Sequence, residues 1–317
     1  MINVGVIGSG FIVPRILETM KQVGGYNIKG ISSPHSYDRL KELKETYEVD
    51  YVTLNYKDLF KDDDIDLIYI ASPNSFHYTQ SKEALLAGKN VLCEKPFTKS
   101  HDKAKELIEL AASKNLTIYE AMTTFSLPLY HKIRELLKDN EVKSVELNFS
   151  QYSSRYDDFI KGIIKPVFNK EMDGGALMDL NVYNIAFTIG LFGEPWNVEY
   201  FPNIQQNIDV GGKLILSYPQ FEASLIANKN KQGPTFIDLI TTKGIIHSDN
   251  PASIIASVKF NDEVYESKDY TNYYYELEEF KRVYEENDIE AINQHNSLTL
   301  SIVKVLEKGL KSAGLDK

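Results

Sequence analysis

The first third of the chain alternates short apolar runs with helix-like segments, and this alternation constrains the fold more than any other feature. Asp66–Ala71 is apolar after its first residue, as strands buried on both faces of a parallel sheet are. Repeated strand–helix alternation predicts a parallel, doubly wound sheet. The predicted strands are residues 3–7, 27–31, 66–71, 91–93 and 116–119. A helix is predicted through Ile16, Leu17 and Met20, with Pro14 in its first turn, and further helices at residues 38–47, 77–87 and 101–113.

After about residue 122 the pattern changes. Val142–Phe149 alternates apolar and polar residues, as a half-solvated strand does, and Lys243-Gly244 has the composition of a hairpin turn. Strands at hairpin spacing predict a mostly antiparallel sheet. Further strands are predicted at residues 196–200, 213–218, 221–227, 235–241 and 245–247, and helices at residues 175–191, 274–284 and 297–311.

The change of pattern predicts two domains, at residues 1–122 and 123–317. No stretch rich in glycine, serine or proline separates them, so the boundary is expected to be a hinge-like crossing. The C-terminal helices are candidates to pack back on the first domain.

Composition restricts the classes of protein. The chain has 317 residues, of which 43% are hydrophobic, enough for a sizeable core. Its formal net charge of -10 argues against a nucleic-acid binder, because phosphate binding needs a basic field. The one cysteine, Cys93, lies in an apolar run and is typical of a buried small residue in a reducing compartment. We find no signal peptide, membrane-spanning run or metal-ligand spacing of histidines, and expect a cytoplasmic protein.

Gly8-Ser9-Gly10 lies between the first predicted strand and the first predicted helix. Glycines there let the backbone approach a pyrophosphate, which the positive end of a helix stabilises. Val13 stands where a third glycine or an alanine is usual, so a tight turn without a ligand stays an alternative. At the head of an alternating pattern, this turn predicts a Rossmann nucleotide-binding domain.

The residues after the second strand bear on the choice of cofactor. An NAD-selective site usually has an acidic residue there, which binds the ribose hydroxyls. Here Ser32 and Ser33 could hydrogen-bond a ribose phosphate, with His35 or Arg39 to supply charge. The pattern therefore leans toward NADP(H) over NAD(H). A solvated helix start is the alternative interpretation of His35 and Arg39.

Two segments follow neighbouring predicted strands of the sheet. Ala71–Asn74 lies at the carboxyl end of a central strand, outside which ligands bind in doubly wound sheets. Pro73 and Asn74 also favour a plain turn, so a loop without a ligand remains open. Lys95, just before Pro96, ends the next strand and is well placed to face a bound cofactor.

These segments resemble the signature of a known family. Ala71–Asn74 with His77, followed by Ala84–Pro96 (ALLAGKNVLCEKP), resembles the Gfo/Idh/MocA oxidoreductases. Gly174–Tyr183 (GGALMDLNVY) resembles the second motif of that family, and the resemblance covers essentially the whole chain. Tyrosine at 183, where many members have histidine, and Glu120-Ala121-Met122 resemble the glucose–fructose oxidoreductase and dihydrodiol (or xylose) dehydrogenase branch.

The resemblance implies the fold and the site. It implies a Rossmann domain joined to an α+β domain with a large, open, mostly antiparallel sheet, in a homodimer or homotetramer. Lys95 would act at the nicotinamide, with Pro96 after a cis bond, and Asp179 and Tyr183 would complete the catalytic set. The chain departs from the pattern at Asn181, where glycine is common. The expected cofactor-binding residues are Gly8, Gly10, Phe11, Ile12, Ser32, Ser33, Arg39, Ala71, Ser72, Pro73, Asn74, His77, Glu94 and Lys95.

Elementary chemistry supports these roles. Asp179 and Tyr183 are four residues apart on a predicted helix, so they share one face. A free tyrosine has a pKa near 10, and a neighbouring ammonium such as that of Lys95 would lower the pKa by favouring the phenolate. Asp179 could hold a substrate hydroxyl or orient the lysine. Taken without the motifs, Asp179 is a solvated helix residue and Tyr183 is half-buried core.

We therefore expect an NAD(P)-dependent oxidoreductase that acts on a secondary alcohol of a sugar, cyclitol or dihydrodiol, with neither nucleic acid nor membrane as a partner. A non-catalytic dinucleotide-binding regulator and an NAD-dependent glycosidase are the alternatives on this fold. Arg155, Phe168 and Asn169 could contact substrate or form a surface loop. Tyr273–Tyr275 is more typical of a core or subunit interface than of a cofactor platform.

Overall fold

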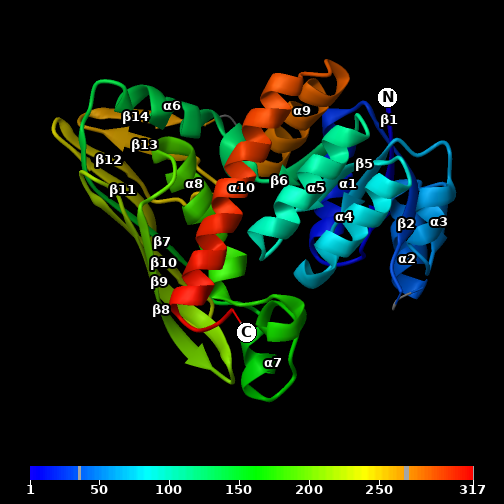
Figure 1. The fold of residues 1–317 in the computed structure, drawn as a ribbon, viewed down its shortest axis with the longest axis horizontal. Coiled ribbons are helices and arrows are strands. Elements are labelled where there is room, and N and C mark those ends of the chain that lie inside the picture. The colour runs from blue at the N-terminus through cyan, green and yellow to red at the C-terminus, as the bar shows by residue number, and fades with distance from the viewer. Residues whose placement is uncertain (35–36, 268–270, 317) are drawn as a thin grey trace. The chain divides into compact units, whose positions relative to one another are not determined.

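The computed structural model describes residues 1–34, 37–267 and 271–316 (Figure 1). His35, expected from the sequence to supply charge near a ribose phosphate, lies outside the described residues. The chain divides into two compact units. The first unit contains Met1–Thr98, Asp102–Ala121 and Tyr273–Ser297, and the second contains Lys99–His101, Met122–Asn272 and Leu298–Lys317.

The described strands of the first unit form a six-stranded parallel sheet. They are β1 (Ile2–Ile7), β2 (Tyr26–Ser32), β3 (Tyr51–Thr53), β4 (Leu67–Ile70), β5 (Asn90–Glu94) and β6 (Ile118–Ala121). Their order, β3-β2-β1-β4-β5-β6, is that of a Rossmann sheet, so the predicted fold is confirmed. The order of the strands reverses between β1 and β4, and sheets of this kind open a crevice for ligands there, at the carboxyl ends of their strands.

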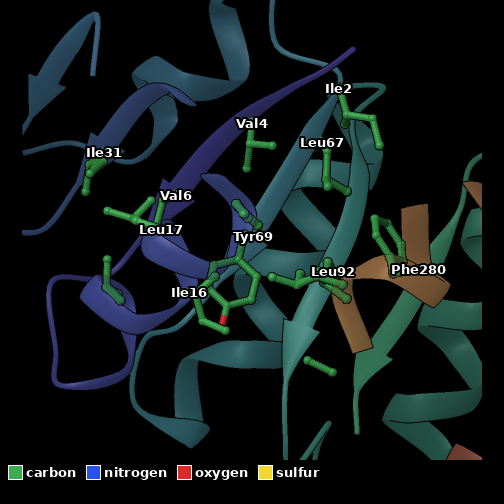
Figure 2. Close-up of a cluster of buried hydrophobic side chains, with 14 of the residues drawn as sticks. Ile2, Val4, Val6, Ile16, Leu17, Ile31, Leu67, Tyr69, Leu92 and Phe280 are labelled. Atoms are coloured by element: carbon green, nitrogen blue, oxygen red, sulfur yellow. The ribbon is translucent and has the colours of Figure 1, made fainter. Parts of the chain in front are cut away.

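Helices cover this sheet because its strands are apolar on both faces. Leu67 and Tyr69 of β4 join the hydrophobic cluster drawn in Figure 2, which also contains Ile16, Leu17 and Phe280 from two of the covering helices. Ile68 and Ile70, which point the other way along the strand, are equally buried. The helical segments of this part of the chain are α1 (Ile12–Val23), α2 (Tyr37–Tyr47), α3 (Lys57–Lys61), η1 (Asn74–Phe76), α4 (His77–Leu86), α5 (His101–Ser113) and α9 (Asn272–Glu285).

The described strands of the second unit form an eight-stranded sheet. They are β7 (Val142–Ser150), β8 (Asn197–Gln205), β9 (Ile208–Ser217), β10 (Glu222–Asn228), β11 (Thr235–Thr241), β12 (Gly244–Ser248), β13 (Ser257–Phe260) and β14 (Glu263–Glu266). The order is β14-β13-β12-β11-β7-β10-β9-β8. Only β7 and β10 pair in parallel among these neighbours, which confirms the predicted mostly antiparallel sheet.

The two faces of this second sheet differ. Ala223, Leu225 and Ala227 of β10 are buried, whereas Ser224 and Ile226 on the opposite face are only half-buried. Figure 1 shows α6 (Pro128–Leu137) and α8 (Val182–Phe192) against one face of the sheet. The other helical segments here are η2 (Thr123–Ser126), α7 (Tyr156–Ile160), η3 (Pro166–Phe168), η4 (Lys170–Met172) and η5 (Leu177–Asn181). The helix α10 (Ile289–Ser312) belongs to the first unit up to Ser297 and to the second unit from Leu298.

The helix predicted at residues 175–191 begins differently from the prediction. Its first turn, η5, is a π-helix, and α8 continues from it to Phe192 before Gly193 with a φ of 73°. Turns of this kind occur frequently at functional sites. Within the described residues, Lys170–Phe192 is long and apolar enough to cross a membrane, with a mean hydropathy of 1.2, and 78% of its most apolar part is buried inside the structure. A core helix has the same composition.

Candidate functional site

The glycine turn after β1 is shaped by close backbone packing. Gly8 has a φ of 130°, and a β-carbon there would lie 2.5 Å from the carbonyl oxygen of Ala71. A β-carbon on Gly10 would meet nothing within 4 Å, so the turn leaves open space beside the first turn of α1. Phe11 is 64% exposed and carries the guanidinium of Arg15 4.1 Å from its ring centroid. Open backbone at a helix N-terminus fits a pyrophosphate, so these residues suit a dinucleotide.

The serines after β2 lie beside this turn. The Ser33 hydroxyl accepts a hydrogen bond from the Ser9 hydroxyl at 3.0 Å, which ties the end of β2 to the glycine turn. Ser32 is fully buried, and its hydroxyl has no hydrogen-bond partner among the described residues. Arg39 is partly exposed on α2 and pairs with Glu42 at 2.6 Å. Of the two serines, Ser33 is therefore the one that lies at the carboxyl edge of the sheet, where a ribose would bind.

His77 connects the ends of two neighbouring strands. It is the first residue of α4 and is fully buried. One ring nitrogen lies 2.9 Å from the carbonyl oxygen of Ser72 after β4, and the other lies 2.9 Å from that of Pro96 after β5. Carbonyl oxygens only accept hydrogen bonds, so the doubly protonated ring satisfies both contacts and a neutral ring satisfies one. The segment Ala71–Asn74, with Asn74 opening η1, is held by this contact and by a 2.6 Å hydrogen bond from Ser72 to Gln80.

Lys95 directly follows β5, and the Lys95–Pro96 peptide bond is cis, as the family resemblance implied. The backbone after it is anchored by Glu120, which is fully buried at the end of β6 and accepts a 2.9 Å hydrogen bond from the N–H of Phe97. The side chain of Glu94 accepts a 2.5 Å hydrogen bond from the Tyr69 hydroxyl. Burial raises the pKa of Glu94, while the Tyr69 bond and the Lys95 charge act in the opposite direction. Lys95 thus extends from a rigid, hydrogen-bonded edge of the sheet.

Sequence reasoning missed a third acid beside this edge, Glu276 of α9. Its side chain is 2% exposed, and Oε2 has no hydrogen-bond partner among the described residues. Burial raises the pKa of Glu276 well above its usual range, and the charges of Glu94 and Glu120 raise it further. The signal in the sequence is a charged residue on the apolar stripe formed by Leu277 and Phe280.

The glutamine variant Glu276→Gln is expected to change how stability depends on pH. A carboxyl whose pKa is higher in the folded state than in the unfolded state binds its proton more tightly when folded. The free energy of unfolding contributed by Glu276 therefore falls as pH rises above about 4.3, the unfolded value. A glutamine side chain cannot ionise, so the variant should melt about 3 °C above the wild type at pH 8, the shift that about 1 kcal/mol produces in a unit of this size.

Thermal unfolding followed by circular dichroism at pH 5 and pH 8 measures this effect. Glu278→Gln, on the exposed side of the same helix, is the matched control and should follow the wild type. Equal pH dependence of the wild type and Glu276→Gln would contradict the assignment of a neutral, buried Glu276.

The second motif is explained by packing around Asp209, which sequence reasoning also missed. A β-carbon on Gly174 would lie 2.5 Å from the carbonyl oxygen of Pro166, and one on Gly175 would overlap the Asp209 carboxylate. Oδ2 of Asp209 accepts hydrogen bonds from the backbone N–H of Leu177 and the hydroxyl of Tyr200, each at 2.7 Å. Burial raises the pKa of Asp209 to about 6. The two glycines therefore let a buried carboxylate hold the start of η5.

Asp179, in the middle of η5, is paired with a buried lysine. Nζ of Lys229 lies 2.7 Å from Oδ2 of Asp179, and the side chains of the lysine and the aspartate are 2% and 28% exposed, respectively. The sequence signal for Lys229 is that it continues the alternation of Leu225 and Ala227, which places it on the buried face of β10. Asp179 is thus a partly exposed carboxylate fixed from behind by an ammonium.

Tyr183 is half-buried in the first turn of α8, with its ring centroid 6.1 Å from that of Phe149. Asn181, where the family commonly has glycine, is fully buried and donates a 3.2 Å hydrogen bond to the carbonyl oxygen of Leu225. The departure from the family pattern therefore ties the π-helical turn to β10. Asp179 and Tyr183 remain together on one continuous helix, in the second unit.

The remaining candidates fall into different environments. Phe168 is buried, Asn169 caps η4 by accepting a hydrogen bond from the N–H of Glu171, and Arg155 is half-buried at the start of α7. Tyr273 packs partly buried against the core of the first unit. In the described part of the chain, no group of three or more His, Cys, Asp or Glu side chains is placed to hold a metal ion.

The glycine turn, the strand order and the polar carboxyl edge of the first sheet define a dinucleotide-binding protein of the Rossmann class. The predicted cofactor residues all belong to the first unit, as does Lys95, whereas Asp179 and Tyr183 belong to the second unit.

Comparison with known proteins gives the family. Residues 2–122 match an oxidoreductase family described by its NAD-binding Rossmann fold, Gfo/Idh/MocA. The NADP(+)-dependent scyllo-inositol 2-dehydrogenase IolU of Bacillus subtilis is 30% identical over 324 residues, which cover 99% of this chain and 98% of the relative. Trans-1,2-dihydrobenzene-1,2-diol dehydrogenase of Xenopus tropicalis is 29% identical over 265 residues, covering 81% and 78%.

A solved structure has the same fold. The 3-ketoreductase KijD10 of Actinomadura kijaniata, in complex with NADP, superposes with a TM-score of 0.82 at 20% identity, covering 98% of this chain and 97% of that one. The chain belongs to the Gfo/Idh/MocA oxidoreductase family. It is an NAD(P)-dependent oxidoreductase that acts on CH–OH groups.

Proposed function

We propose that this protein transfers hydride between NADP(H) and a secondary alcohol or carbonyl of a sugar, cyclitol or dihydrodiol. The observation that carries this proposal is the fixed carboxyl edge of the first sheet, where Lys95 follows a strand of the same sheet as the glycine turn. The similarity to an inositol dehydrogenase, a dihydrodiol dehydrogenase and a 3-ketoreductase supports it, because each of these names describes chemistry at a secondary alcohol or its ketone.

The preference for NADP(H) rests on the residues after β2. Gly8 and Gly10, with the N-terminus of α1, would hold the pyrophosphate, and Ser33 and Arg39 would meet the ribose phosphate. The described residues from the end of β2 to the start of α2 offer no carboxylate to repel that phosphate before Asp38. The NADP(+)-dependent inositol dehydrogenase and the structure of the 3-ketoreductase in complex with NADP agree with this preference.

We assign the proton transfer to Lys95 and Tyr183. A bound nicotinamide would accept or supply the hydride. The phenol of Tyr183 would take the hydroxyl proton of the substrate, or return it to a carbonyl oxygen, and the ammonium of Lys95 would favour the phenolate form. Asp179 would accept a hydrogen bond from a substrate hydroxyl. These roles require that the first-unit lysine and the second-unit helix act on one substrate.

The open face of the second sheet supports a further part of the proposal, a homodimer or homotetramer. Four apolar residues that the strand registers place on this face are strongly exposed: Phe201 (59%), Ile240 (39%), Ile245 (50%) and Val264 (60%). Exposed apolar residues that recur along one face of a sheet are typical of a protein–protein interface. A second copy of the chain is the occupant that the family implies.

Nucleotide titration followed by an activity panel tests the function. NADP is expected to raise the melting temperature more than NAD at equal concentration, with about 2.7 kcal/mol of stabilisation at a hundredfold excess over its Kd. A panel of cyclitols, aldoses and dihydrodiols should then contain a substrate that reduces NADP stoichiometrically. Binding without reduction would indicate a regulator, and substrate cleavage without net reduction would indicate a glycosidase. Absence of any nucleotide effect on melting would contradict the proposal outright.

A further inference from the structure

The strongest feature that the proposed chemistry leaves unexplained is the buried ammonium of Lys229. Its side chain is 2% exposed, directly after β10. Nζ lies 2.7 Å from Oδ2 of Asp179, donates a 2.8 Å hydrogen bond to the carbonyl oxygen of Val167, and lies 4.6 Å from the ring centroid of Phe168. All of these groups belong to the second unit.

This environment fixes the charge of Asp179. A buried ammonium is unfavourable unless an anion and further hydrogen bonds compensate it, and Asp179 supplies the anion. The same contact favours the ionised carboxylate, because an adjacent positive charge stabilises it. An ionised carboxylate only accepts hydrogen bonds. Asp179 can therefore bind a hydroxyl of a substrate but cannot donate a proton to it.

Lys229 also joins two segments that the sequence placed near the substrate. Its bond to Val167 and its contact with the Phe168 ring hold η3, and its ion pair holds η5. Asp209 holds the start of η5 at Leu177, and the Lys229 charge also acts on Asp209. The π-helical turn is thus fixed by Asp209 at its start, by Lys229 at its middle and by the Asn181 hydrogen bond at its end.

Asp179 lies one helical turn before Tyr183, which has consequences for the substrate. If Tyr183 meets the reacting hydroxyl, a carboxylate acceptor one turn away meets a second hydroxyl of the same molecule. Lys229, which is 2% exposed and pairs with Asp179, determines where that acceptor lies. Its role is one of positioning.

We propose that Lys229 is a positioning residue that holds Asp179 ionised and in place, and that it thereby selects substrates with a hydroxyl beside the reacting carbon. The inference rests on the proposed function, because it requires Asp179 to contact the substrate.

Four variants test it: Lys229→Met, Asp179→Asn, the double variant, and Lys231→Met as the control on an exposed lysine two residues away. Lys229→Met is expected to bind NADP as the wild type does and to lose about 100-fold in kcat/KM toward a vicinal polyol. The acidic limb of its pH profile should move to higher pH, because Asp179 loses the charge that keeps it ionised. Lys231→Met should be unchanged.

The double variant separates positioning from general damage. Once Asp179 is replaced by Asn, Lys229 has no carboxylate to place, so adding Lys229→Met should change kcat/KM less than about threefold. A further hundredfold loss in the double variant would overturn the proposal. If Lys229→Met alone does not fold, the comparison of the double variant with Asp179→Asn still tests the proposal, because the double variant contains no unpaired buried charge. If no polyol lets the wild type reduce NADP, the proposed function is refuted. If the wild type is active but the losses in kcat/KM of the two single variants multiply in the double variant, only this inference is refuted.

Discussion

Replacing Lys95 by alanine is expected to lower kcat by about 10²–10⁴-fold, the usual contribution of a group that takes part in proton transfer. Lys95 directly follows β5, and the backbone just after it is held by hydrogen bonds to Glu120 and His77, so its conformation should be kept in the variant. NADP should still raise the melting temperature, because the glycine turn is untouched. Steady-state kinetics and thermal-shift titration on the same preparation measure both quantities.

Lys103→Ala, on the exposed side of α5, is the matched control and should keep wild-type turnover. A Lys95→Ala enzyme that turns over at the wild-type rate would remove the lysine from the chemistry. A variant that loses NADP binding and turnover together would assign Lys95 to cofactor binding alone.

Tyr183→Phe is expected to lower kcat by about 10²–10³-fold with little change in stability. The substitution removes the hydroxyl and keeps the ring, so the contact with Phe149 is retained. Because the proton acceptor is lost, the rise of kcat for alcohol oxidation with increasing pH, which reflects ionisation of the phenol, should disappear from the residual activity. A pH profile of kcat on the wild type and the variant measures this.

The control for that experiment is Tyr265→Phe on β14, which removes a phenol that bonds Glu263 in the second unit. It should leave kcat and its pH profile unchanged. Retention of both kcat and its rise with pH in Tyr183→Phe would show that another group carries the proton.

Elements with strong local signals were predictable from the sequence. β4 is an uninterrupted apolar run, and α5 was predicted at its observed bounds, His101–Ser113. β3 was missed because three residues against β2 leave too short a pattern to recognise. β14 was missed because its residues are mostly exposed, so its pairing with β13 and not its composition defines it. Nothing in the sequence indicated the π-helical turn at Leu177–Asn181.

The candidate site divides in the same way. Lys95, Asp179 and Tyr183 stand in contiguous motifs, so reading along the chain finds them. Asp209 on β9 and Lys229 directly after β10 support the η5 turn that carries Asp179, and only the folded sheet brings them to it. In a single sequence, a supporting residue of this kind is visible at most as a charged residue in an apolar pattern. Lys229, which continues the alternation of Leu225 and Ala227, is such a residue.

The contacts of His77 bear on how such an enzyme could be redesigned. One imidazole joins the carbonyl oxygens of Ser72 and Pro96, so the two loops that follow β4 and β5 are coupled and respond together to any insertion. A designer who wants a new specificity should therefore leave this edge intact. Residues 161–165, which are solvent-exposed between α7 and η3, are the place to graft new loops.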